Sequence, residues 1–136
     1  MSSTNYYNTF IEIAEDSKAE IGTPPPQRGS KKSVANYEFE IMSENPYCFT
    51  SDDVIFQVFA LRNNIAESEF KAQRELYFSK GRPCFRASPL TKTYGWGVHS
   101  DSEGKVAIVA VESEAYQAFV NDPEIRKKKA MRSKRA

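Results

Sequence analysis

The chain has 136 residues, of which 40% are hydrophobic and 12% aromatic, so it can bury a core and is unlike a disordered protein. The aliphatic run at residues 106–111 is too short to span a bilayer, and the first residues lack the basic and apolar regions of a secretory signal. The net charge of +1 conceals an asymmetry, because residues 126–135 hold seven Lys and Arg and no acid. We therefore predict a cytoplasmic protein with a single domain over residues 1–125 and a flexible basic tail over residues 126–136.

The first third of the chain predicts a strand, a loop and a helix. Residues 9–14 are rich in β-forming side chains, which indicates a strand. Three consecutive prolines within residues 22–32 favour a stiff, extended loop. Ser33 is suited to cap a helix over residues 34–44, although Phe39 and its neighbours also alternate as in a strand. We prefer the helix, with an apolar stripe of Val34, Tyr37 and Ile41.

Two more helices are predicted in the middle of the chain. Residues 50–53 offer capping acceptors and negative charge to the N-terminus of the first, which ends at residues 62–64. Residues 66–69 begin the second, and Gly81 is placed for its C′ position. Phe56 widens the apolar surface of the first helix, so we expect that helix to be central. Its apolar stripe consists of Val54, Ile55, Val58, Phe59 and Leu61.

A hairpin and a short helix follow. Side chains alternate along residues 94–99, a polar turn spans residues 100–104, and residues 105–111 are strongly β-forming. Ser113 is suited to cap one last helix. These elements predict an α+β fold, with a small antiparallel sheet of the N-terminal strand and the 93–111 hairpin covered by three to four helices.

Gly95 and Gly97 lie on one face of the hairpin strand, and two interpretations of them stay open. Either a helix packs tightly over them, or they form the floor of a shallow pocket bordered by His99. His99 is the only histidine and therefore the one candidate for catalytic acid–base chemistry by a histidine, with a plain surface residue as the alternative. Cys48 and Cys84 are expected to be buried thiols, and no Cys or His spacing fits a metal, so we predict no metal and no cofactor.

The stretch before the hairpin, residues 82–92, is expected to be irregular and carries candidate anion ligands. Arg86 and Lys92 supply cationic donors and Ser88 a hydroxyl, which together suit a carboxylate or a phosphate. The alternative is ordinary pairing with the acidic body, residues 1–125, which hold all 18 Asp and Glu of the chain but only 12 of its 19 Lys and Arg. The basic tail could stay solvated, bind nucleic acid without sequence preference, or bind an acidic partner.

Several stretches resemble a family of small bacterial proteins known only as a domain of unknown function. The longest is residues 81–100, from Gly-Arg-Pro-Cys-Phe-Arg-Ala-Ser-Pro to Tyr-Gly-Trp-Gly-Val-His-Ser; residues 5–12, 45–47 and 50–54 support it. The resemblance covers nearly the whole chain and implies a bacterial cytoplasmic protein with a self-contained domain, but it transfers no activity. The aromatic hairpin followed by a helix is also similar to YjbR-type small α+β proteins, a likeness of fold alone.

Three hypotheses of function follow. The preferred one is a non-enzymatic module that binds an anionic ligand or nucleic acid, with no membrane partner. The second is an enzyme with His99 as general acid or base and with Arg86 or Lys92 holding an anionic substrate. The third is a structural or adaptor protein without a small-molecule site. The candidate ligand-binding residues are Arg86, Ser88, Lys92, Tyr94, Trp96 and His99.

Overall fold

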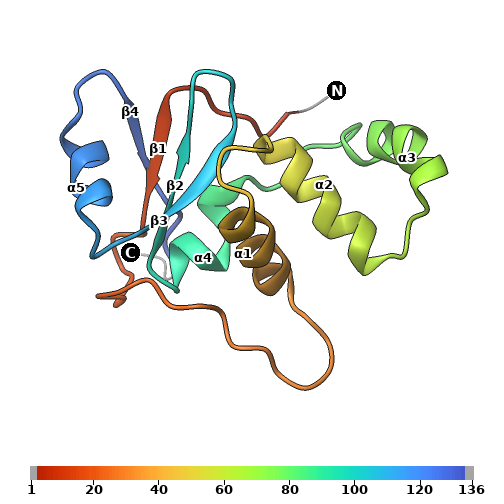
Figure 1. The fold of residues 1–136 in the computed structure, drawn as a ribbon, viewed down its shortest axis with the longest axis horizontal. Coiled ribbons are helices and arrows are strands. Elements are labelled where there is room, and N and C mark those ends of the chain that lie inside the picture. Colours follow the sequence, from red (N-terminus) through yellow and green to blue (C-terminus); the bar gives the residue numbers. More distant parts are fainter. Residues whose placement is uncertain (1–2, 134–136) are drawn as a thin grey trace.

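The computed structural model describes residues 3–133 and confirms the α+β fold class. Within these residues, four strands form one sheet in the order β3-β2-β1-β4 (Figure 1). The predicted N-terminal strand and hairpin are present, since β1 pairs antiparallel with β2 and β2 pairs antiparallel with β3. The strands are β1 (Thr9–Glu12), β2 (Trp96–Ser100), β3 (Val106–Ala110) and β4 (Arg126–Lys129).

The α-helices begin where the sequence places capping residues. Ser33 and Thr50 each form a reciprocal capping box at the start of a helix, and Ser113 accepts a hydrogen bond from the backbone of Tyr116. The preference for a helix over a strand at residues 34–44 is confirmed. The helices of residues 3–133 are α1 (Val34–Glu44), α2 (Ser51–Arg62), α3 (Phe70–Tyr77), α4 (Pro89–Lys92) and α5 (Glu114–Asn121), with short 3-10 turns at Glu67–Glu69 and Phe85–Ala87.

β4 makes the sheet mixed rather than antiparallel, and it is a strand that the sequence does not predict. It runs parallel to β1, with Arg126 opposite Thr9 and Lys129 opposite Glu12. Its four cationic side chains have little strand preference, so backbone pairing with β1 determines its conformation. At residues 126–129 the structure thus differs from the expected flexible tail, and residues 134–136 of that tail lie outside the described residues.

The two faces of the sheet bury separate clusters of side chains. On one face, Val98 of β2 belongs to a cluster with Met42 of α1 and Leu90 of α4. On the other face, the Phe10 ring of β1 packs on Tyr116 and Phe119 of α5, with ring centroids 4.9 and 5.2 Å apart. Figure 1 shows α5 on one side of the sheet and α1 and α4 on the other. The sheet therefore stands between two helical layers.

The buried face of α1 differs from the predicted one, whereas that of α2 differs at a single position. The predicted stripe of α1, from Val34 to Ile41, is only partly buried, because the helix turns Ala35 and Met42 inward instead. In α2, Phe56 is buried as expected, but Leu61 is 53% exposed. The spacing of apolar residues thus identified both helices and most of the buried face of α2, but it placed the buried face of α1 on the wrong side.

The segment between α3 and β2 is more regular than predicted. α3 ends at Tyr77 with Phe78 as its C-cap, so Gly81 lies beyond the C′ position expected for it. Residues 82–92 contain a 3-10 turn and then α4, which begins with Ser88 as cap and Pro89 at its first position. Proline is well suited to that position because its missing N–H has no helical partner there.

Close packing accounts for both hairpin glycines. A Cβ on Gly97 would lie 2.6 Å from the Phe10 ring and 2.9 Å from the Tyr116 ring of α5. Gly95 has a φ of 81°, and a Cβ there would lie 2.3 Å from the carbonyl oxygen of Ile21. Aromatic rings, the Ile21 carbonyl and the Ala19 side chain therefore fill the space in which a pocket with the two glycines as its floor would lie.

We predict that Gly97→Ala destabilises the fold by about 1–3 kcal/mol, because the added methyl group must displace two buried rings. The matched control is Gly81→Ala, where nothing lies within 4 Å of the new Cβ. The control should change stability by less than about 1 kcal/mol. Chemical denaturation of both variants measures the difference, and equal effects would contradict the packing argument.

Candidate functional site

Glu38 places a carboxyl at a core position of α1. It shares a helical face with the buried Ala35 and Met42, three and four residues away, and only 6% of its surface is exposed. The start of α1 fixes this orientation, since Asn36 completes the capping box and its amide also donates to the carbonyl of Pro25 at 2.8 Å. The local structure therefore directs an ionisable group into the interior.

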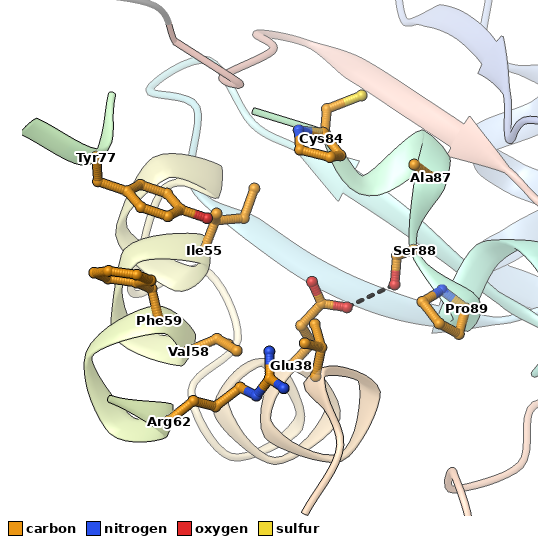
Figure 2. A pocket seen from close by; sticks show the side chains of 12 residues that line it. Glu38, Ile55, Val58, Phe59, Arg62, Tyr77, Cys84, Ala87, Ser88 and Pro89 are labelled. Atoms are coloured by element: carbon orange, nitrogen blue, oxygen red, sulfur yellow. Dashed lines mark hydrogen bonds between the residues drawn. The ribbon is translucent and has the colours of Figure 1, made fainter. Parts of the chain in front are cut away.

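The Glu38 carboxyl faces a cavity of about 290 Å³ between α1, α2, the end of α3 and residues 83–89 (Figure 2). Ser88 Oγ donates a hydrogen bond of 2.6 Å to Glu38 Oε1. Among the described residues no other side chain or backbone group forms a hydrogen bond or ion pair with this carboxyl, which leaves Oε2 available to a ligand. The walls are mainly apolar and include Ile55, Val58, Phe59, Tyr77, Ala87 and Pro89.

The environment alters the acidity of Glu38. Burial raises its pKa to about 7, and the hydrogen bond from Ser88 opposes the shift by favouring the ionised form. A carboxyl with this pKa can be either protonated or ionised near neutral pH. Groups of that kind accept a proton or a hydrogen bond from a bound molecule more readily than an ordinary, fully solvated carboxylate.

Other titratable side chains line the same cavity. Burial raises the pKa of the Tyr77 hydroxyl; Arg82, whose guanidinium lies 3.9 Å from the ring centroid, opposes this shift, and the Glu38 carboxylate adds to it. Arg62 is exposed at the α2 side of the cavity. Cys84 also lines the cavity, and neither cysteine of the chain is buried, so the expectation of two core thiols is wrong. The cavity thus combines one buried acid with polar groups around an apolar centre.

Of the six residues predicted to bind a ligand, Ser88 is the one that lines this cavity. Arg86 lies two residues earlier but turns to β4, where its Nε donates to the carbonyl of Lys129 at 2.7 Å. Lys92, at the end of α4, borders a different surface hollow beside residues 16–23. The residues predicted to bind an anion therefore lie in different surroundings and do not line one cavity.

The aromatic candidates are also dispersed. Trp96 donates its indole N–H to the carbonyl of Thr23 at 2.8 Å, and its ring lies 5.5 Å from that of Phe39. Tyr94 is partly buried against the core that contains Val98. Both side chains pack against other parts of the domain, and their role as ligand-binding residues stays a prediction.

His99 lies on the opposite face of β2 from Trp96, because side chains alternate along a strand. Its Nδ1 is 2.8 Å from the hydroxyl of Tyr47, an exposed residue with a φ of 58°, and its ring stacks on Phe119 at 4.0 Å. Burial lowers the pKa of His99, while Asp101 and Asp122 act in the other direction. The neutral ring is therefore favoured, and a catalytic role for it stays a prediction.

The whole chain, residues 1–136, matches a family described as a family of unknown function, DUF6157. The chain belongs to this family. The resemblance to a domain of unknown function is thereby confirmed, whereas searches of curated proteins and of solved structures found no significant match. Membership of DUF6157 transfers no reaction or ligand, so the cavity has to be interpreted from its own chemistry.

Two kinds of feature are absent from residues 3–133. Within residues 3–133 no helix has both the length and the apolar character needed to cross a bilayer. In the same range, no three His, Cys, Asp or Glu side chains gather in a way that could hold a metal ion.

Sequence reasoning overlooked Glu38 because it placed the apolar stripe of α1 on the wrong side. One signal was available, since Glu38 lies three residues after Ala35 and four before Met42, within a helix that also carries Phe39. A helical wheel drawn with Ala35 and Met42 inside would have put this glutamate in the core. Nothing local to the sequence would have paired it with Ser88, which is 50 residues away.

We predict that Glu38→Gln changes the pH dependence of stability. The carboxyl ionises at a pKa of 4.5 when unfolded and about 7 when folded, so the wild type loses stability as the pH rises between these values. Glutamine keeps an acceptor for Ser88 but does not titrate. Relative to the wild type, the variant should gain about 3 kcal/mol between pH 4.5 and pH 8. Denaturant unfolding at several pH values tests this, and a pH-independent difference would contradict it.

We also predict that Ser88→Ala raises the pKa of Glu38 further, because it removes the hydrogen bond that favours the ionised form. The matched control is Ser113→Ala, which deletes a comparable helix cap on α5. Both variants should lose about 1 kcal/mol of stability through the lost cap. Carboxyl ¹³C NMR titration should show the pKa change in Ser88→Ala alone, and a shift of equal size in both would refute the pairing.

Proposed function

We propose that the protein is a small-molecule-binding module whose Glu38 cavity holds a compact, mostly apolar ligand bearing an amine or a similar hydrogen-bond donor. The observation behind the proposal is the buried Glu38 carboxyl, which has one hydrogen-bond partner among the described residues and faces an apolar cavity. A volume of about 290 Å³ is near the lower end of the range for ligand sites, which is why a compact ligand is favoured.

The free oxygen of Glu38 determines the polarity of the ligand. A buried carboxylate that lacks partners is costly, and a donor that completes its hydrogen bonds removes part of that cost. An ammonium group also supplies the opposite charge, which makes the hydrogen bond stronger than a neutral one. The apolar walls then take the rest of the ligand, with Phe59 and Tyr77 offering aromatic surface.

A binding role is supported over catalysis by what surrounds the carboxyl. A Glu–Ser pair resembles the base and nucleophile of covalent catalysis, but such a base is usually oriented by a third group. Among the described residues Ser88 is the one hydrogen-bond partner of Glu38, and Ser88 Oγ also accepts from the backbone N–H of Leu90. The hydroxyl is therefore engaged as a helix cap.

This proposal keeps the preferred class of function from the sequence but reverses the charge of the ligand. The sequence favoured an anion held by Arg86 and Lys92, whereas the Glu38 cavity favours a donor or a cation. The anionic ligand, the enzyme based on His99 and the adaptor protein stay alternative hypotheses. A ligand with an acidic group beside its amine would also meet Arg62 at the edge of the cavity.

Phenethylamine and phenethyl alcohol test the proposal, because they share an aromatic body and differ in the charge of the donor. The wild type should bind phenethylamine, with NMR shift changes confined to residues that line the cavity, and affinity should increase as Glu38 ionises above its pKa of about 7. Glu38→Gln should weaken binding of the amine about tenfold or more and change binding of the alcohol much less.

The control variant is Glu40→Gln, which removes an exposed carboxylate of α1 that pairs with Lys32 and does not line the cavity. It should leave binding of both probes unchanged. Failure of the wild type to bind either probe at millimolar concentration, or equal loss of amine binding in Glu38→Gln and Glu40→Gln, would refute the proposal.

A further inference from the structure

The basic residues at the C-terminal end have different surroundings on the two sides of β4. Lys127 donates through Nζ to the backbone carbonyls of Asp122 and Ile125. Lys129 and Arg132 both pair with Glu15, at 3.3 and 2.6 Å. These three cations are therefore engaged by the body of the domain.

Arg126 and Lys128 lie on the other side of the strand, because side chains alternate along it. Both are exposed, and neither side chain forms a hydrogen bond or ion pair with another described residue. They line one wall of a hollow of about 590 Å³, whose other wall is residues 5–9. The hollow thus holds two cations without partners among the described residues and the carboxylate of Glu124, and it faces a segment with polar and aromatic side chains.

The facing segment is held firmly against β4. Asn8 has a left-handed backbone, with a φ of 48°; its N–H donates to the carbonyl of Asp101 and its own carbonyl accepts from the N–H of Arg126. Tyr7 is 54% exposed but backed by Gly104, where a Cβ would lie 2.9 Å from the ring. The hollow is therefore lined by an exposed tyrosine and by two cations.

We propose that this groove between β4 and residues 5–9 binds single-stranded nucleic acid without sequence specificity. Arg126 and Lys128, about 7 Å apart along one face of the strand, would contact phosphates of one nucleic-acid strand. Tyr7 supplies a ring on which a base stacks, an interaction that every base can make. Glu124 also lines the groove and offers an acceptor to base amino groups.

The same features disfavour a peptide as the occupant. β4 is an edge strand, but four consecutive cations on such an edge discourage another strand from pairing with it. An acidic peptide could satisfy the two cations, yet it has no need of an exposed tyrosine. The combination of unpaired cations and an aromatic ring in a groove is the pattern expected for a single strand.

Fluorescence anisotropy of a labelled oligo-dT of about 20 nucleotides tests the proposal on the full chain. Arg126→Gln/Lys128→Gln should weaken binding about tenfold at low salt and reduce the slope of log affinity against log salt by about 1.4, the value for two phosphates on a single strand. Tyr7→Leu should weaken binding several-fold and leave the salt slope unchanged, because stacking releases few counterions.

The matched control is Lys71→Gln/Lys80→Gln, which removes the same charge from exposed positions in and beyond α3. It should change affinity by less than about twofold, and circular dichroism confirms that each variant is folded. Three results would overturn the proposal: no binding of the wild type at about 50 mM salt, equal losses in the two double variants, or a polyglutamate of the same length binding as tightly as the oligo-dT.

Discussion

The rest of the structure depends on one constraint, which is that β1 pairs with a neighbouring strand along each of its two edges. β1 joins the hairpin through β2 and the end of the chain through β4, so one short strand connects three distant parts of the sequence. Its Phe10 ring fills the space above Gly97 on one face, while Ile11 enters the larger core on the other. Loss of register in β1 would therefore disturb both cores at once.

The pairing of β4 with β1 also positions the wall of the Glu38 cavity that contains Ser88. The N–H of Met131, just after β4, donates to the carbonyl of Arg86, whose side chain donates back to the carbonyl of Lys129. Two residues later Ser88 caps α4 and reaches Glu38. The C-terminal strand thus holds the segment that carries the hydrogen-bond partner of the buried carboxyl, although the strand itself does not line the cavity.

What the sequence predicts well is local. Capping residues such as Ser33, Thr50 and Ser113, together with alternation in the hairpin, identify four helices and three strands because their signals lie within a few residues. β4 has no such signal, since its lysines form a strand only when β1 is beside them. The sequence does not predict the cavity either. Its Glu38–Ser88 pair forms only when α1 and α4 pack on the same face of the sheet, and no local signal in the sequence reports that packing.

The run of cations at the end of the chain illustrates how tertiary structure divides a feature that looks uniform in sequence. Read as composition, it is a charged tail attracted to an acidic body or to an external anion. Pairing with β1 places alternate residues of β4 on opposite sides of the sheet. Lys127 and Lys129 therefore bind groups of the domain itself, whereas Arg126 and Lys128 face the groove. A shift of one residue in that pairing would exchange the two sets. The register of β4, rather than the number of charges, therefore decides which cations an external ligand can reach.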